Sequence, residues 1–118
     1  MGFIISGIQQ VGIGVHNAEE AWTWYRKHFG MDVPIFKDAA TASLMTRYTA
    51  GNAEQRYAIL AMNMQGGGGF EIWQYTSRTP NPASFIPHLG DTGIFAVKIK
   101  SRNVTASYNE LKAKGATL

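Results

Sequence analysis

The sequence contains no cysteine among its 118 residues, which excludes disulfides, thiolate zinc sites and cysteine nucleophiles. This absence is typical of a cytoplasmic protein, and we expect that location. Long apolar runs are also missing. No stretch approaches the roughly 20 residues of a membrane-spanning helix, so we expect no membrane partner. The apolar start, residues 1–8, lacks a basic leader and runs into Gln9 and Gln10, which indicates an incoming strand rather than a signal peptide.

Charge is sparse as well, at 16% of residues with a formal net charge of +3, whereas 45% of residues are hydrophobic. This composition is typical of a globular protein, and the length allows one domain with its own core. Lys98, Lys100 and Arg102 alternate along one segment, as expected for a solvated strand face, so we expect no nucleic-acid partner. The glycine run 66–69 lacks the Lys-Ser/Thr ending of a phosphate-binding loop and predicts a turn.

A helix is predicted immediately after the first strand. Asn17 is a favourable N-cap, and Glu19 and Glu20 follow in the first turn, where acidic side chains complement the helix dipole. Gly30 supplies the stop after Phe29. Apolar residues recur at helical spacing and predict the buried stripe, which we expect to be core: Ala18, Ala21, Trp22, Tyr25 and Phe29.

Period-two alternation predicts strands before and after this helix. The expected strands cover residues 7–15, 32–37, 56–63 and 69–76. Residues 39–49 form either a short helix or an irregular crossing. The order strand, helix, strand, strand, strand predicts an α+β fold built on a βαβββ module over residues 1–78.

The beginning of the chain is repeated after a proline-containing connector at residues 79–89. Residues 10–13 align with 91–94, and the helix at 17–29 aligns with residues 103–114, which Gly115 again terminates. Residues 90–118 therefore indicate a partial second module that contains only a strand and a helix.

Polar side chains occur in two otherwise apolar strands. Alternation places Gln10 on one face of the first strand, and places Glu71 on one face of its strand together with Trp73 and Tyr75. A carboxylate and a carboxamide on an aromatic-lined sheet face can bind a divalent metal ion or a polar ligand atom. Trp73 and Tyr75 are the candidate substrate-binding residues, since aromatic rings bind flat or apolar substrate parts.

The sequence resembles the vicinal oxygen chelate superfamily, which contains glyoxalase I (lactoylglutathione lyase), extradiol dioxygenases and bleomycin-resistance proteins. Four segments carry the resemblance, which extends over the whole chain, and their order matches the family: the strand at 10–15, the helix through Phe29-Gly30-Met31, the strand Phe70-Glu71-Ile72 and the restart at 90–94. The resemblance implies paired βαβββ modules, with a divalent metal ion on the concave sheet face.

The resemblance implies a metal-ligand set, position by position. Gln10 matches the first ligand position, which is His or Gln in glyoxalases, and Glu71 matches the second. Asp91 stands at the third, where the family usually has His, although an Asp is able to bind a metal. The fourth ligand belongs to a strand that this chain does not reach. We therefore expect either a longer natural protein or a second copy that completes the site, and predict a homodimer.

The function implied by this resemblance is that of a glyoxalase I-like lyase or isomerase. Such an enzyme uses Zn, Ni, Co, Mn or Fe and acts on a small oxygenated substrate through a stabilised enediolate. The sequence assigns no catalytic base. The alternative is a metal-free protein of the bleomycin-resistance type that sequesters a small molecule. An extradiol dioxygenase is disfavoured, because Gln10 and Asp91 stand where its two imidazole ligands are needed.

The three histidines are not predicted as metal ligands. His88 lies in the connector and is expected at the surface. His16 is expected in a turn, and His28 at a polar position of the helix.

Overall fold

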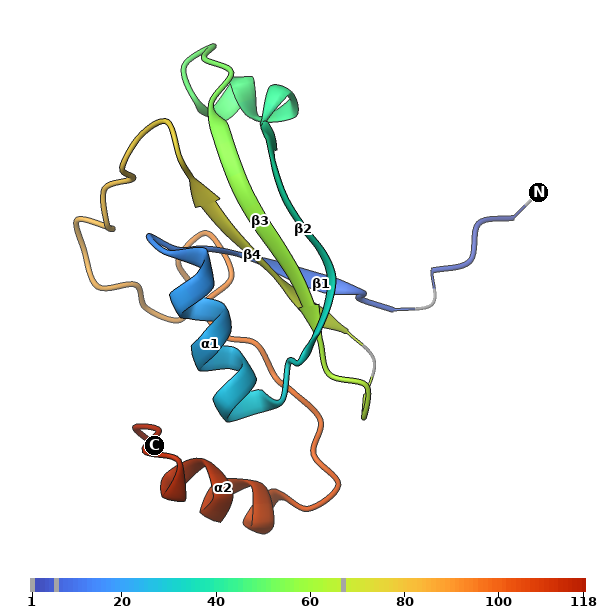
Figure 1. The fold of residues 1–118 in the computed structure, drawn as a ribbon. Helices are drawn as coiled ribbons and strands as arrows, with labels where there is room; N and C mark the ends of the chain where they lie inside the picture. Colours follow the sequence, from blue (N-terminus) through green and yellow to red (C-terminus); the bar gives the residue numbers. More distant parts are fainter. Residues whose placement is uncertain (1, 6, 67) are drawn as a thin grey trace. The chain divides into compact units, whose positions relative to one another are not determined.

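The computed structural model describes residues 2–5, 7–66 and 68–118. The remaining positions, in the expected incoming strand and in the glycine turn, lie outside the described residues. The chain divides into two units, residues 1–79 and 80–118. The first unit contains β1 (Gln10–Gly14), α1 (Ala18–Phe29), β2 (Val33–Thr41), the 3-10 helix η1 (Ser43–Tyr48), β3 (Gln55–Met62) and β4 (Gly69–Tyr75), as Figure 1 shows. The second unit contains α2 (Val104–Ala113).

The four strands form one mixed sheet in the order β1-β4-β3-β2. β1 runs parallel to β4, and the other two pairings are antiparallel. Because α1 connects β1 at one edge with β2 at the other edge, the first unit is the predicted βαβββ module. The fold class is α+β, as the sequence predicts.

The helix forms where the sequence places it. The side chain of Asn17 accepts a hydrogen bond from the backbone N–H of Glu20, which satisfies one of the donors that a helix start leaves unpaired. Gly30 ends the helix with φ of 59°, a left-handed conformation that glycine adopts without a steric penalty. Local signals in the sequence therefore set both ends of α1.

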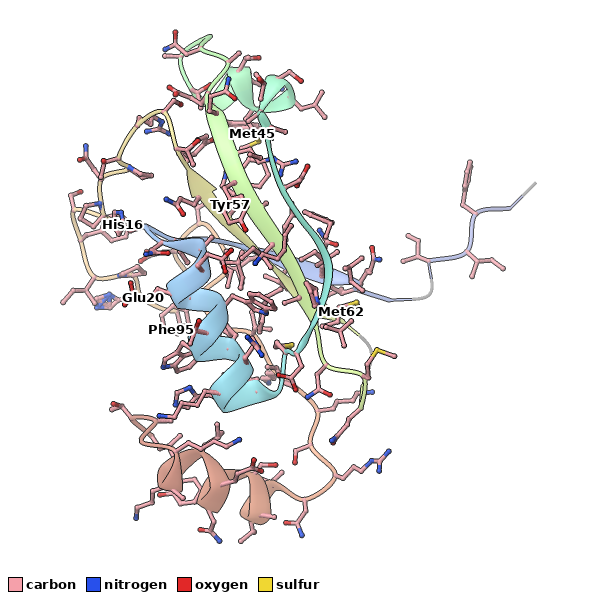
Figure 2. The ribbon with its side chains drawn as sticks, viewed as in Figure 1. His16, Glu20, Met45, Tyr57, Met62 and Phe95 are labelled. Atoms are coloured by element: carbon pink, nitrogen blue, oxygen red, sulfur yellow. The ribbon has the colours of Figure 1, made fainter. Side chains whose placement is uncertain are left out.

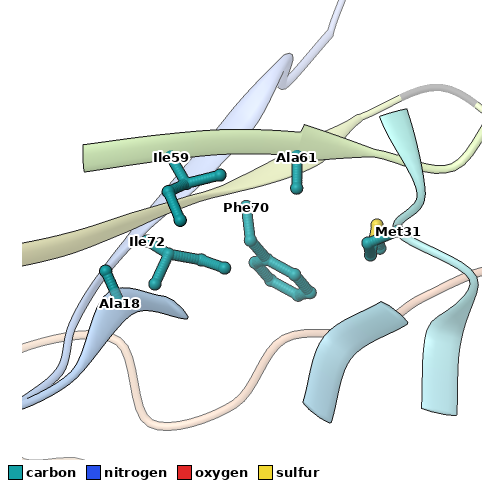
Figure 3. Close-up of a cluster of buried hydrophobic side chains, with 6 residues drawn as sticks. All are labelled: Ala18, Met31, Ile59, Ala61, Phe70 and Ile72. Atoms are coloured by element: carbon teal, nitrogen blue, oxygen red, sulfur yellow. The ribbon is translucent and has the colours of Figure 1, made fainter. Parts of the chain in front are cut away.

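The core lies between α1 and one face of the sheet, which we call the near face. Figure 3 shows its centre, where side chains of β3 and β4 meet residues at the two ends of α1. The buried members are Ala18, Met31, Ile59, Ala61, Phe70 and Ile72. Ala21, Trp22, Tyr25 and Phe29 pack against this cluster, so the predicted apolar stripe of the helix is confirmed as core. Trp22 also donates its indole N–H to the carbonyl oxygen of Met31 over 2.9 Å.

Two expectations about the strands are wrong. β2 continues to Thr41 instead of ending at residue 37, because β3 holds it in register as far as the pair Thr41 and Gln55. The segment after β2 is the 3-10 helix η1, one of the two expected alternatives. In the second unit, no strand forms at residues 91–100. A strand needs a neighbour for its backbone hydrogen bonds, and the described residues supply none there.

The second unit contains the predicted helix. Asn103 caps α2 by accepting a hydrogen bond from the N–H of Ala106 over 2.9 Å, and Gly115 follows the helix with φ of 83°. These are the same two signals, an Asn cap and a terminal glycine, that delimit α1. Among the residues that the structure describes, no helix is long and apolar enough to cross a membrane.

Candidate functional site

The candidate site lies on the far face of the sheet, which is the face opposite α1. Residues that pair across strands share a face, so the register identifies its members. Gly12, Glu71 and Leu60 form one row across β1, β4 and β3. Trp73 and Ala58 belong to the next row. The alternation predicted from the sequence therefore holds: Glu71, Trp73 and Tyr75 share the far face with Gln10.

Gln10 and Glu71, two of the predicted ligands, are in direct contact on this face. The amide Nε2 of Gln10 donates a hydrogen bond to Oε2 of Glu71 over 2.5 Å, and both side chains are partly buried. The two residues are 61 positions apart in the chain, and they meet because β1 pairs in parallel with β4. The contact places a carboxylate and a carboxamide side by side at the edge strand and its neighbour.

This pair supplies part of a metal site. A half-turn of the Gln10 amide about its last side-chain bond exchanges nitrogen and oxygen, and the pair then presents two adjacent oxygen ligands. Oxygen ligands suit hard or borderline divalent ions, which need roughly four to six ligands in total. The residues fit such an ion as two members of its ligand set. Within residues 2–5, 7–66 and 68–118, no three His, Cys, Asp or Glu side chains gather in a metal-binding group.

Asp91, the third predicted ligand, belongs to the second unit. Its carboxylate Oδ2 accepts a hydrogen bond from the backbone N–H of His88 over 2.7 Å, and the backbone N–H of Asp91 donates to the carbonyl of His88. The Asp91 side chain therefore closes a local turn, an arrangement that aspartate commonly adopts. Its role as a ligand stays a prediction.

Trp73 and Tyr75 form the aromatic part of the far face. Their ring centroids are 6.2 Å apart in an edge-to-face arrangement, and both side chains are half-buried. An arginine lies over each ring: the Cζ atom of Arg56 is 5.2 Å from the Trp73 centroid, and that of Arg78 is 4.4 Å from the Tyr75 centroid. Both aromatic residues are thus held by cation–π contacts.

Arg56 and its partner Asp38 are far-face residues that the sequence prediction missed. Arg56 Nη1 lies 2.5 Å from Asp38 Oδ1, which joins β3 to β2. Alternation in the segment 56–63 places Arg56 on the same face as Ala58 and Leu60, which was an available signal. Asp38 carried no such signal, because the expected strand ended one residue before it.

A second polar cluster lies on the near face, away from the candidate site. Glu19 accepts hydrogen bonds from the hydroxyl of Tyr57 over 2.6 Å and from Lys37 Nζ over 2.8 Å. Figure 2 labels Tyr57 on β3 and Glu20, the neighbour of Glu19, on α1. The hydrogen bond from Lys37, with a second from Tyr57, lowers the pKa of Glu19. The same contacts raise the pKa of Lys37 and of Tyr57. This cluster joins the helix to the sheet.

The expectation for His28 is wrong. The side chain is 7% exposed, Nδ1 is 2.8 Å from the carbonyl oxygen of Trp24, and the ring stacks on the Trp24 indole with centroids 4.2 Å apart. His28 is therefore a packed structural residue rather than a polar surface position. His88 is exposed, as expected, and His16 lies at an exposed bend after β1.

Comparison with known proteins identifies a family. The profile described as Glyoxalase/Bleomycin resistance protein/Dioxygenase superfamily matches residues 7–118. A solved crystal structure of a glyoxalase family protein from Bacillus cereus is similar to this chain, with a TM-score of 0.68 and 11% sequence identity. The similarity covers 96% of this chain and 74% of that one, and at this identity it is a similarity of fold. No curated protein matches the chain.

Proposed function

Because the chain belongs to the Glyoxalase/Bleomycin resistance protein/Dioxygenase superfamily, we propose that it is a metal-dependent enzyme of the glyoxalase type. The substrate is a small molecule with adjacent oxygen atoms, and the reaction is that of lactoylglutathione lyase or a related lyase or isomerase. The observation that carries the proposal is the contact between Gln10 and Glu71 over 2.5 Å on the far face.

In this proposal Gln10 and Glu71 hold the divalent ion, which is Zn, Ni, Co, Mn or Fe. The ion, when bound, polarises the oxygen atoms of the substrate and so makes an adjacent C–H bond more acidic. Trp73 and Tyr75 bind the apolar part of the substrate and exclude water from it. We assign no catalytic base.

The remaining ligands come from outside the first unit. Asp91 is the third ligand in this proposal, because its position matches the ligand position of the family and a carboxylate suits the same ions as Glu71. We also propose a homodimer, in which a second copy completes the substrate site. Among the described residues, the edge strand β1 pairs on one side only, and such an edge is commonly covered by association. Size-exclusion chromatography with light scattering tests this. A monomer at all concentrations contradicts it.

The experiment that tests the metal site is elemental analysis of the protein after incubation with each of the five metal salts and desalting. The wild type is compared with Gln10→Ala and Glu71→Ala. Two matched controls, Gln9→Ala and Glu20→Ala, remove the same side-chain types at exposed positions nearby. We expect stoichiometric metal in the wild type and controls and its loss in both site variants. Metal that stays bound in Glu71→Ala contradicts the proposal.

A second candidate function is metal-free sequestration of a small molecule. The observation that favours it is the donor role of Gln10, since its amide already satisfies the Glu71 carboxylate without a cation. In that case Glu71 pairs with a cationic group of the ligand, and Trp73 and Tyr75 supply the binding surface. Ligand affinity that a chelator leaves unchanged supports this candidate. Affinity that the chelator abolishes supports the enzyme.

A further inference from the structure

Arg56 stands at a fixed position on the far face of the sheet. Its side chain is only 16% exposed, although it is long and charged. The guanidinium lies over the Trp73 indole and makes three hydrogen bonds to Asp38. Contacts on two sides leave few rotamers for this side chain, so little conformational entropy remains to be lost when a ligand binds to it.

The sheet register explains how the guanidinium is held down. Trp73, Ala58 and Asp38 occupy one row across β4, β3 and β2. Because the guanidinium contacts the first and the last member of this row, it lies across the middle member, Ala58. Ala58 is completely buried, and its methyl group leaves room for the arginine above it. A larger side chain at this position would lift the guanidinium away from the sheet.

One edge of the guanidinium is not used by Asp38. Of the five N–H groups of arginine, Nη1 donates to the backbone oxygen of Asp38 over 3.1 Å and to its Oδ1 over 2.5 Å, and Nη2 reaches Oδ2 over 3.4 Å. Nε and the second hydrogen of Nη2 form the other edge. Within the described part of the chain, Nε donates no hydrogen bond. This edge matches the two oxygens of a carboxylate.

The unused edge belongs to the same surface as the Gln10–Glu71 pair. Glu71 and Trp73 are two residues apart on one strand face, so their Cα atoms are about 7 Å from each other. Arg56 lies over the ring of Trp73. The surface therefore carries an acidic end at Glu71, an aromatic platform at Trp73 and a preorganised cation at Arg56, within the length of a small molecule.

We propose that Arg56 is a specificity-determining residue that selects substrates carrying a carboxylate. The carboxylate binds to the Nε–Nη2 edge in a two-point contact, the body of the substrate lies on Trp73, and Asp38 orients the guanidinium. The substrate class is a small carboxylic acid with a neighbouring carbonyl or hydroxyl oxygen. This inference rests on the proposed function, since it identifies the substrate of the same surface.

Arg78 supplies a matched control. It too lies over an aromatic ring, that of Tyr75, and has an acidic partner, Glu54. However, its Nε lies 3.6 Å from Glu54 Oε1, so this edge is already directed at a carboxylate. Removing Arg78 takes away one positive charge and one cation–π contact, as removing Arg56 does, without removing the unused edge.

The test uses two probes of the same shape, phenylglyoxylate and its neutral amide, titrated into the protein by calorimetry with and without the bound metal. A two-point, charge-assisted contact predicts that the acid binds to the wild type about 10-fold to 100-fold more tightly than the amide. Arg56→Gln abolishes this preference, because it weakens binding of the acid far more than binding of the amide. Arg56→Lys loses most of it, because an ammonium cannot make the two-point contact. Arg78→Gln keeps it. An inorganic phosphate titration distinguishes a carboxylate site from a general anion site.

Two further measurements extend the test, and the first of them needs no variant. In the wild type, the Nε–H nuclear magnetic resonance signal of Arg56 should shift with phenylglyoxylate and not with the amide. Ala58→Leu should reduce the acid preference without removing any polar group. Equal affinity for the two probes, no binding of the acid, tighter binding of phosphate than of the acid, or a preference that survives in Arg56→Gln each overturns the inference.

The proposed function fails in a different way. Metal uptake that depends on Glu71, combined with no acid preference, overturns the role of Arg56 and leaves the metal site standing. An Arg56-dependent acid preference in a protein that takes up none of the five metals supports the role of Arg56 and contradicts the metal-dependent enzyme. The two proposals are therefore separated by two readouts, metal content and acid preference.

Discussion

Gln10 and Glu71 meet diagonally rather than directly across the sheet. The register places Gln10 beside Gly69 and places Glu71 beside Gly12, so each polar side chain faces a glycine on the neighbouring strand. The Gln10 side chain leans one step along β4 and reaches the Glu71 carboxylate over 2.5 Å. The parallel register of β1 and β4 therefore brings the two polar side chains together.

The two glycines predict opposite responses to substitution. A Cβ atom at Gly69 would stand 2.4 Å from the carbonyl oxygen of Ala61 and 2.8 Å from Cγ of Met62, whereas a Cβ atom at Gly12 meets nothing within 4 Å. We expect Gly69→Ala to lower the free energy of unfolding by about 1–3 kcal/mol, because a backbone atom must move. Gly12→Ala should leave it unchanged or raise it slightly. Urea unfolding followed by circular dichroism measures both. A Gly69→Ala protein as stable as Gly12→Ala contradicts the prediction.

The near-face cluster predicts how stability depends on pH. The pKa of Glu19 is lowered in the folded protein by its hydrogen bonds from Lys37 and Tyr57. The contribution of Glu19 to the free energy of unfolding is therefore present above its ordinary pKa of 4.5. It is lost as the pH falls through the lower pKa of the folded protein. Relative to Glu19→Gln, the wild type should lose melting temperature as the pH falls below about 4.5. Glu20→Gln is the matched control, and thermal melts from pH 3 to pH 8 provide the measurement.

At alkaline pH, the partners of Glu19 give the opposite dependence of stability on pH. The pKa values of Lys37 and Tyr57 are raised by the same hydrogen bonds. Their contribution to the free energy of unfolding is present below their ordinary pKa values of 10.5 and 10.0. It is lost as the pH rises through the higher pKa values of the folded protein. Melts continued from pH 8 to about pH 11 measure this loss. Identical melting profiles for the wild type and Glu19→Gln at both the acid and the alkaline end would refute the coupling.

The sequence predicted α1 and its packing correctly because every signal for that helix is local. The Asn17 cap, the apolar spacing and Gly30 all act within one or two turns. The end of β2 depends instead on a distant strand. Asp38, Ala39 and Ala40 have low intrinsic strand propensity, and they are extended because β3 pairs with each of them. Propensity in that segment is overridden by a neighbour that the local sequence does not reveal.

The same distinction applies to the candidate site. Alternation alone places Gln10 and Glu71 on faces of their own strands, and the order of elements then brings those faces together. The pairing of Arg56 with Asp38 requires the register of β2 against β3, including the shift between Pro34 and Phe36. A one-residue change in register reverses the face of every side chain. The sequence could therefore identify the polar pair and not the ion pair next to it.

The N-cap of α1 offers a test of the local signals. Asn17→Ala removes the acceptor for the Glu20 N–H, which lies 3.2 Å from Oδ1, and should lower the free energy of unfolding by about 1 kcal/mol. Asn17→Asp keeps an acceptor and adds a negative charge at the helix start, so its stability should match the wild type or exceed it. Chemical unfolding of the wild type and the two variants measures these differences in the free energy of unfolding. An alanine variant indistinguishable from the aspartate variant would show that the cap contributes nothing.

Ile72 and Ile35 provide a matched pair for the core. Ile72 is fully buried at the centre of β4, between Ile13 of β1 and Ile59 of β3, whereas Ile35 on β2 is 53% exposed. Ile72→Ala removes the same atoms as Ile35→Ala and leaves a cavity that the sheet and α1 cannot close completely. We expect it to cost about 2–5 kcal/mol. Ile35→Ala should cost less than about 1 kcal/mol, because most of its side chain is already in water. Equilibrium unfolding of both variants measures the difference, and equal losses would mean that the cluster around Ile72 is not the core that holds the sheet against the helix.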